Sequence, residues 1–244
     1  ELIEMAEATG VQIRYEAAVA GGIPVIKVLR ESLAANAVTE VAGIINGTGN
    51  FILTEMSTKG RAFGDVLAEA QTLGYAEADP TFDIDGTDAA HKLVILASLA
   101  FGIPLRIDAP MKQGIQEVAT EDLEHAASMG YRVKHLGIAR RTEQGIEMRV
   151  HPTLIPERKQ IATVDGVLNA VMISGDAVGE VVLVGPGAGG AATASSVCAD
   201  LVDVARNPAG SGPALGIAAV ALQAPNWVPV EDIASEWYLR FTAT

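Results

Sequence analysis

The residues with the clearest potential for chemistry lie between Gly74 and Lys92. This stretch combines a single lysine with five acids, which are Glu77, Asp79, Asp83, Asp85 and Asp88. A solvated loop seldom needs so many acids beside so little basic charge. A lysine among acids, where a hydroxyl or carbonyl group can approach, is a candidate proton donor or acceptor.

The element that must position this lysine is a helix. Apolar residues recur at helical spacing over residues 87–101, and Gly102 closes the run. Asp88 and Lys92 are four residues apart, so they share one face of its first turns. The plain interpretation is a surface ion pair. The rest of the helix is nearly free of charge, however, which places the pair at the mouth of a buried element and favours chemistry.

A longer pattern surrounds the pair. The run Ala70-x-x-x-Gly74-Tyr75, then Ala78-Asp79-Pro80-x-x-Asp83-Ile84-x-Gly86-x-Asp88-x-x-x-Lys92, resembles the signature of homoserine dehydrogenases. By this resemblance Lys92 would be the proton-transfer residue, and Asp88 with Glu77 would hold the amino group of homoserine. Tyr75 and Asp83 would belong to the same substrate site. Gly74 would approach the nicotinamide cofactor, NADP or NAD.

The resemblance implies an enzyme that interconverts L-homoserine and L-aspartate 4-semialdehyde by hydride transfer, on the route to threonine, isoleucine and methionine. Two alternatives stay open. The chain could be a non-catalytic binding and dimerisation module whose acids form a solvated loop or a cation site, or part of a dehydrogenase for another amino-acid aldehyde. Catalysis requires Lys92, Asp88 and Glu77 to converge within a few ångströms, and the module does not.

Composition limits the class of protein. A chain of 244 residues with 49 % hydrophobic content can bury a sizeable core. The net charge of −13 argues against nucleic acid or an anionic membrane as partner, and no apolar run reaches transmembrane length. The single cysteine, Cys198, rules out an internal disulfide and suits a reducing, cytoplasmic compartment. Its apolar helical surroundings predict a buried, inert thiol.

An acid near the beginning of the chain is a second candidate. Alternation predicts a strand from Val11 to Ala20, followed by a helix from about Pro24 to Asn36. The plain interpretation of Glu16, within that strand, is a cap or a partner for a nearby base. The family pattern suggests a sodium site instead, since carboxylate and carbonyl oxygens are hard ligands. Its other ligands would be the backbone carbonyls of Val19, Gly21 and Ile23.

Two glycine-containing turns add candidates. Residues 46–50 lead from a strand into a helix that ends at Gly60, so Thr48 could cap that helix or present its hydroxyl to a small substrate. The resemblance places Thr48 in the homoserine pocket. Residues 185–190 fit G-x-G-x-x-G between a strand and a helix over 192–206, but no second strand bearing an acid follows at the required distance. The resemblance makes Gly189, with Gly187, the backbone contact to the cofactor.

The remaining pattern indicates an α/β (α+β) fold. Strands are expected over 40–46, 131–141, 146–154, 169–173 and 180–184, forming one mixed sheet covered by helices. Residues 1–184 would be the substrate-binding and dimerisation domain. Residues 185–244 would return to the nucleotide-binding half and begin a linker, whose alternating residues 237–242 predict a strand. We expect an excised part of a longer enzyme that forms a homodimer and, alone, is inactive.

Overall fold

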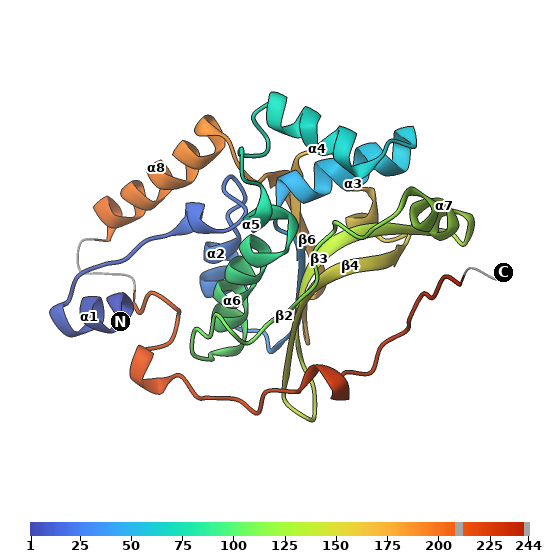
Figure 1. Ribbon diagram of the computed structural model, residues 1–244. Coiled ribbons are helices and arrows are strands. Elements are labelled where there is room, and N and C mark those ends of the chain that lie inside the picture. Colours follow the sequence, from blue (N-terminus) through green and yellow to red (C-terminus); the bar gives the residue numbers. More distant parts are fainter. Residues whose placement is uncertain (208–211, 242–244) are drawn as a thin grey trace.

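The computed structural model describes residues 1–207 and 212–241. Within them, a six-stranded mixed sheet runs through the molecule in the order β2-β4-β3-β1-β5-β6 (Figure 1). Every neighbouring pair is antiparallel except β2 with β4. The strands are β1 (Val38–Ile44), β2 (Met111–Lys112), β3 (Tyr131–Arg141), β4 (Ile146–Pro156), β5 (Leu168–Gly175) and β6 (Gly179–Pro186).

The helices pack mainly on one face of this sheet, and α6 lies across β1, β3 and β4. Its apolar stripe is buried through Leu93, Leu96 and Ala97, which join the largest hydrophobic cluster. The α-helices are α1 (Leu2–Thr9), α2 (Val25–Lys27), α3 (Gly47–Lys59), α4 (Phe63–Thr72), α5 (Thr81–Ile84), α6 (Thr87–Phe101), α7 (Thr120–Ser128) and α8 (Gly190–Arg206). None of the described helices is both long and apolar enough to cross a membrane.

The opposite face of the sheet is covered by the chain's own return from β4 to β5. Ile161, Ala162 and Val164 from this return are buried against Ile44 and Ile138. Adjacent residues of a strand point to opposite faces, so β1 can supply Val41 to one cluster and Ala42 to the other. The central strands are therefore buried on both sides, and their positions are fixed by two layers of packing.

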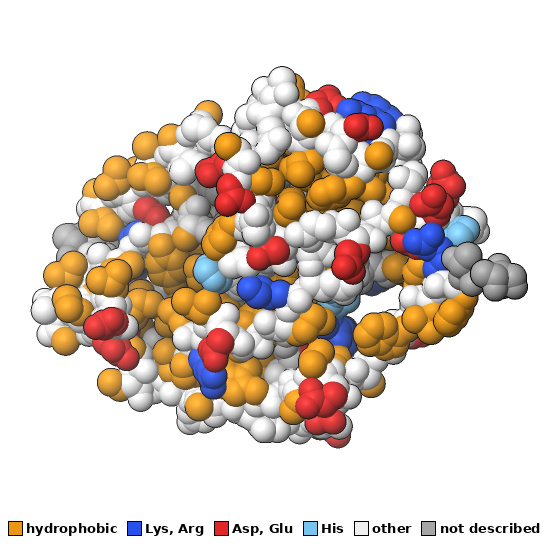
Figure 2. Space-filling model, viewed as in Figure 1, with side chains coloured by type: hydrophobic (Ala, Val, Ile, Leu, Met, Phe, Trp, Pro, Cys, Tyr) orange, Lys and Arg blue, Asp and Glu red, His pale blue; other side chains and the backbone are white. Residues whose placement is uncertain are grey.

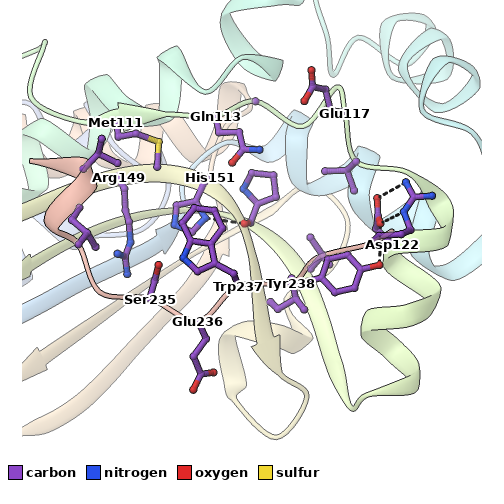
Figure 3. Close-up of a pocket in the computed structure, with 18 residues that line it drawn as sticks. Met111, Gln113, Glu117, Asp122, Arg149, His151, Ser235, Glu236, Trp237 and Tyr238 are labelled. Atoms are coloured by element: carbon purple, nitrogen blue, oxygen red, sulfur yellow. Dashed lines mark hydrogen bonds and ion pairs between the residues drawn. The ribbon is translucent and has the colours of Figure 1, made fainter. Parts of the chain in front are cut away.

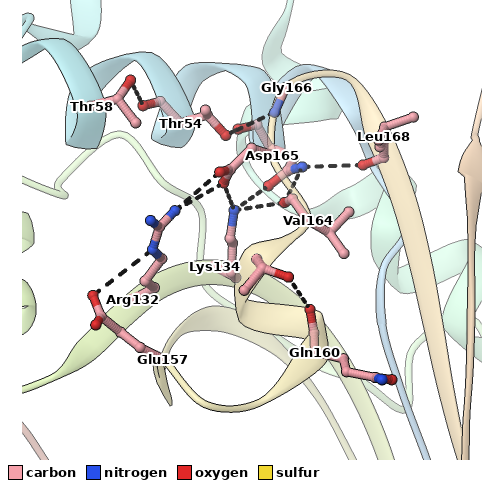
Figure 4. Close-up of polar contacts among 12 residues, drawn as sticks. Thr54, Thr58, Arg132, Lys134, Glu157, Gln160, Val164, Asp165, Gly166 and Leu168 are labelled. Atoms are coloured by element: carbon pink, nitrogen blue, oxygen red, sulfur yellow. Dashed lines mark hydrogen bonds and ion pairs between the residues drawn. The ribbon is translucent and has the colours of Figure 1, made fainter.

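A buried lysine ties α3 to this framework (Figure 4). The ammonium group of Lys134, on β3, donates to the side-chain oxygen of Asn50 at 3.2 Å, the carbonyl of Val164 at 2.7 Å and the carboxylate of Asp165 at 2.8 Å. Asn50 in turn donates to the carbonyls of Val164 and Leu168. Burial lowers the pKa of Lys134, while Asp165 opposes that shift. The network fixes where α3 begins.

Several expected elements are confirmed. The mixed sheet, the hairpin of β3 and β4, and the helix over residues 87–101 are present. The predicted strand from Val11 to Ala20 is wrong, because residues 11–15 pair with no strand in the described part of the chain and Glu16–Ala18 form a 3-10 turn. The predicted helix to Asn36 ends at Ser32, after α2 passes into a π-helical turn over Val28–Ser32.

Two expectations about the end of the chain are also wrong. Cys198 is exposed, because α8 lies outside the sheet, where it contacts the turn at residues 16–18 and buries only Ser196. Residues 237–241 are extended but pair with no described strand, and residue 242 lies outside the described residues. Strand β6 continues to Pro186 as a member of the same sheet, so the glycine-rich turn follows directly from that sheet.

Candidate active site

Lys92 and Asp88 meet in the first turns of α6. The ammonium nitrogen of Lys92 lies 2.7 Å from Oδ2 of Asp88 and 3.1 Å from the carbonyl oxygen of Ile45. Their side chains are 24 % and 19 % exposed. The pair is therefore held by the protein and still reachable from outside, as a proton-transfer group requires.

Asn46 joins this pair to the neighbouring acids. Its Nδ2 donates to Asp88 at 2.8 Å and to Asp83 at 2.9 Å, while its Oδ1 accepts the backbone N–H of Gly49 at 2.8 Å. The Gly49 contact assigns which end of the amide is the oxygen. Asn46 thus caps α3 and orients two carboxylates with one side chain. Sequence reasoning missed this role, although an asparagine before Gly-x-Gly at a helix start is a capping signal.

The acids form an electronegative cluster. Burial raises the pKa of Asp83, the hydrogen bond from Asn46 opposes the shift, and the negative charges of Asp88 and Glu77 add to it. Lys92 acts in the opposite direction. A cationic group that entered the cluster would favour ionised Asp83. The cluster therefore suits an ammonium group better than an anion.

Glycine and an acid shape the start of α6. Gly86 has a φ of 87°, and a side-chain carbon added to it would lie 3.2 Å from the ring of buried His135. Asp85 accepts both the backbone N–H and the hydroxyl of Thr87 at 2.8 Å. The left-handed turn and the local cap direct the helix start, with Asp88 and Lys92, toward Asn46.

The other expected substrate residues lie on the loop after α4. The hydroxyl of Thr48 donates to the carbonyl oxygen of Tyr75 at 2.5 Å, so the start of α3 is bonded to that loop. Tyr75 packs its ring edge-on against Phe51. Glu77 is exposed, and its carboxylate makes no hydrogen bond or ion pair with Lys92 or Asp88 in the described structure. The structure thus brings Lys92 and Asp88 together and leaves Glu77 at the rim, so the expected convergence of the three residues is seen for Lys92 and Asp88 alone.

The glycine-rich turn lies against the turn at residues 20–23. The N–H of Gly22 donates to the carbonyl of Pro186 at 3.0 Å, and a side-chain carbon on Gly21 would come within 2.6 Å of the carbonyl oxygen of Gly187. Gly189 has a φ of 108°, and space is open where its side chain would be. Gly74 has a φ of 76° and the same open space. Both positions admit the close approach of another molecule.

Glu16 performs the capping role that its plain interpretation predicts. Its two carboxylate oxygens accept the backbone N–H groups of Ile26 at 2.8 Å and Lys27 at 2.9 Å. Burial raises its pKa, and these two hydrogen bonds oppose that shift. Among the expected carbonyl ligands, Gly21 accepts the hydroxyl of Ser196 and Ile23 accepts the N–H of Val25. The described residues contain no cluster of three His, Cys, Asp or Glu side chains suited to a metal ion.

A separate cavity lies beneath the extended segment near residue 240 (Figure 3). It has a volume of about 420 Å³ and is lined by His151, Trp237 and Tyr238, among others. Tyr238 and Arg240 hold the segment in place through Asp122. Neither Lys92 nor Asp88 lines it, so this cavity is separate from the cluster around Asn46. On the face drawn in Figure 2, the coloured side chains form no continuous basic patch.

Comparison with known proteins gives the family of this chain. The sequence profile of the homoserine dehydrogenase family matches residues 24–202. The chain belongs to this family. It is 58 % identical to the homoserine dehydrogenase of Pseudomonas aeruginosa and 53 % identical to that of Neisseria gonorrhoeae, in each case over the whole chain. The chain spans 57 % of the length of either relative.

Solved homoserine dehydrogenases share the fold. The crystal structure of the Thiobacillus denitrificans enzyme matches with a TM-score of 0.82 and 62 % identity, over 83 % of this chain and 47 % of that one. A hyperthermophilic archaeal homoserine dehydrogenase in complex with NADPH matches with a TM-score of 0.72 and 32 % identity, over 84 % of this chain and 59 % of that one. The family and the α/β fold expected from the sequence are confirmed.

Proposed function

We propose that the full-length protein containing this chain is an NAD(P)-dependent homoserine dehydrogenase. It would interconvert L-homoserine and L-aspartate 4-semialdehyde in the synthesis of threonine, isoleucine and methionine. The observation that carries the proposal is the position of Lys92. Its ammonium group is fixed by Asp88 and the Ile45 carbonyl at the mouth of a buried helix, beside a cluster of acids.

Substrate binding follows from the charges of this cluster. Asp88 and Asp83, oriented by Asn46, face the place where the ammonium group of homoserine would bind, and Glu77 would close over it from the rim. The first turn of α3 offers backbone N–H groups of the kind that bind carboxylates. Thr48 and Tyr75, joined by a hydrogen bond, would form the wall between these two ends.

Lys92 would transfer the proton to and from the reacting oxygen. During reduction of the aldehyde it donates a proton to the developing alkoxide, and during oxidation it receives the proton from the hydroxyl group of homoserine. Asp88, 2.7 Å from the Lys92 ammonium nitrogen, would orient that group toward the reacting oxygen. A nicotinamide cofactor supplies or accepts the hydride when bound. The open positions at Gly74 and Gly189, with Gly187 behind, fit one wall of that cofactor site.

The test is a homoserine oxidation assay on the full-length protein and on Lys92→Ala. We expect the variant to lose about 10²- to 10⁴-fold in turnover, as is typical when a general acid-base group is removed. The matched control is Lys59→Ala, since Lys59 forms an exposed ion pair on α3. An unchanged rate in Lys92→Ala would remove Lys92 from the mechanism and favour the non-catalytic module. A substrate panel of other amino-acid aldehydes tests the remaining alternative.

Sodium binding belongs to the same proposal. The carbonyl oxygens of Val19, Gly21 and Ile23 are hard donors suited to a monovalent cation. Both oxygens of Glu16 already accept backbone N–H groups, so Glu16 would contribute through its remaining lone pairs. Sodium chloride should raise the melting temperature more than choline chloride of equal ionic strength. Equal melting temperatures in the two salts would contradict a sodium site.

We also propose a cytoplasmic homodimer. Strand β6 lies at an edge of the sheet and exposes Val184 at 51 %, so an apolar edge is available to a second copy. Light scattering at micromolar concentration should return twice the chain mass of 25.3 kDa. A monomer mass would contradict the dimer and leave the proposed chemistry unaffected.

A further inference from the structure

Asn169 lies between the two loops that the proposed function assigns to substrate and cofactor. It stands on β5, paired with Gly185 of β6, and is 1 % exposed. Its carboxamide lies directly on Gly187, because a side-chain carbon added there would be 2.1 Å from the Asn169 amide atoms. On the other side, its Oδ1 lies 3.6 Å from the place where a side-chain carbon of Gly47 would be. One side chain thus fills the space between the start of α3 and the glycine-rich turn.

The polarity of Asn169 is not explained by packing. Its Oδ1 is buried and has no hydrogen-bond partner among the described residues. Leaving such a group unpaired costs about 1–3 kcal/mol relative to a paired one, and an apolar residue of similar size would avoid that cost. The Oδ1 does lie beside the first residue of α3, where the positive end of the helix dipole stabilises an electron-rich oxygen.

The backbone around Asn169 is held firmly. The carbonyl of the preceding residue, Leu168, accepts a hydrogen bond from Asn50 of α3 at 3.1 Å. Asn50 is itself bonded to Lys134. Movement of Asn169 would therefore require movement of α3 as well. Its side chain thus keeps Gly187 at a fixed distance from α3.

We propose that Asn169 is a positioning residue. It would set the distance between the loop at residues 46–50, which would bind homoserine, and the loop at residues 185–190, which would bind the cofactor. This inference rests on the proposed function. Hydride transfer needs the reacting carbons of two separately bound molecules to meet in one geometry, and a displacement of about 1 Å can reduce the rate 10²-fold. The Asn169 amide, wedged against Gly187 and beside Gly47, fixes that geometry without touching the reacting atoms.

The test compares Asn169→Ala and Asn169→Asp in the full-length protein. Asn169→Ala should lower kcat by about 10²-fold, with the KM of each substrate within about threefold of wild type, because binding survives while alignment is lost. With homoserine deuterated at its reacting carbon, the isotope effect on kcat should rise as hydride transfer becomes rate-limiting. Asn169→Asp preserves the shape and the Oδ1 and should retain most of kcat.

The matched control is Asn36→Ala, because Asn36 accepts a hydrogen bond at the far end of the same β5–β6 hairpin. It should lower the melting temperature without changing the isotope effect. The same outcome for Asn169→Ala would overturn the proposal, since it would show a purely structural role. A wild-type protein that fails to oxidise homoserine would instead overturn the proposed function.

A double variant tests the packing on which the inference depends. Gly187→Ala should destabilise the protein, because its side-chain carbon would overlap the Asn169 amide. Asn169→Ala with Gly187→Ala should recover stability, since the space vacated by one change accepts the other, while kcat stays low. Additive losses of stability would contradict the contact between Asn169 and Gly187.

Discussion

The proposed site has a homoserine-binding side and a cofactor-binding side, and the two differ in how many of their side chains this chain holds in place by hydrogen bonds. Asn46, Asp83, Asp88 and Lys92 are joined by hydrogen bonds of 2.7–2.9 Å. The glycine-rich turn is followed by α8, whose outer face exposes Val197 at 46 % and Leu201 at 65 %. Under the proposed function, the comparison teaches that the homoserine-binding side would be preorganised, whereas this chain would supply one wall of the cofactor site.

Polar contacts attach α8 to the rest of the chain. Asp203 binds Lys27, Asp200 accepts the N–H of Glu16, and Ser196 donates to Gly21. These contacts lie on one side of the helix, and no described residue buries the apolar side chains on the other. A dinucleotide also needs a complete βαβ unit to hold its pyrophosphate and ribose. We therefore expect the two sides to respond differently to truncation and mutation.

The largest expected effect concerns cofactor affinity. Calorimetric titration with NADPH should show micromolar binding to the full-length protein and binding at least about 10²-fold weaker to this chain alone, because one strand and helix cannot replace a βαβ unit. The chain alone should also fail to oxidise homoserine. Micromolar binding by the chain would break the comparison and make the glycine-rich turn a self-sufficient cofactor site.

Asp88→Asn should weaken the use of homoserine and leave cofactor binding unchanged. Removing one partner from a partly buried, hydrogen-bonded charge pair typically costs about 2–5 kcal/mol, so kcat/KM for homoserine should fall by at least about 30-fold while the cofactor KM stays within twofold. Asp79→Asn, in the exposed turn before α5, is the control. If cofactor KM rose in parallel with the loss in kcat/KM, the two sides would not be separable.

Lys134→Met should destabilise the protein where β3 contacts the start of α3, next to the homoserine-binding side. It leaves the side-chain oxygen of Asn50 without its buried donor and removes one of the two hydrogen bonds to the Val164 carbonyl, with an expected loss of about 2–4 kcal/mol in the free energy of unfolding. Arg132→Met is the control, because Arg132 binds the same Asp165 from a more exposed position. Urea unfolding measures both. A smaller loss for Lys134→Met than for Arg132→Met would contradict the network.

Lowering the pH should have a smaller effect on the free energy of unfolding. Burial lowers the pKa of His135 to about 4, and the positive charge of nearby His151 adds to the shift, while the Gln113 carbonyl and Asp85 oppose it. The unfolded chain therefore binds this proton more readily. Stability from a neutral His135 is complete above about pH 6.5 and is lost as the pH falls toward 4.

Urea unfolding between pH 7 and pH 4.5 measures this loss. His135→Gln should lose less stability over that range than the wild type, since glutamine does not titrate. His125→Gln, at an exposed position on α7, should follow the wild type. A wild-type acid dependence in His135→Gln would show that other groups are responsible.

The sequence could predict the features that depend on local spacing. The helix over residues 87–101 and the facing of Asp88 and Lys92 follow from a period of 3.6 residues, and the structure has both. The contacts of Asn46 with Asp83 and Asp88 could not be predicted, because these carboxylates lie 37 and 42 residues away. Alternation in residues 11–20 indicated a strand, but residues 11–15 pair with no described strand, and alternation alone does not supply a partner. The helical pattern around Cys198 was real, but periodicity does not say what covers a helix.

The central position of β1 also has a consequence for how the chain folds. Glu40 on β1 binds Arg140 on β3, 100 residues later, and Thr39 binds the carbonyl of Ser174 on β5, 135 residues later. During synthesis β1 must wait for both neighbours, and such distant contacts slow folding. Until then the apolar residues of β1 stay available to other chains. We expect refolding yield to fall as protein concentration rises, even where the finished protein is stable.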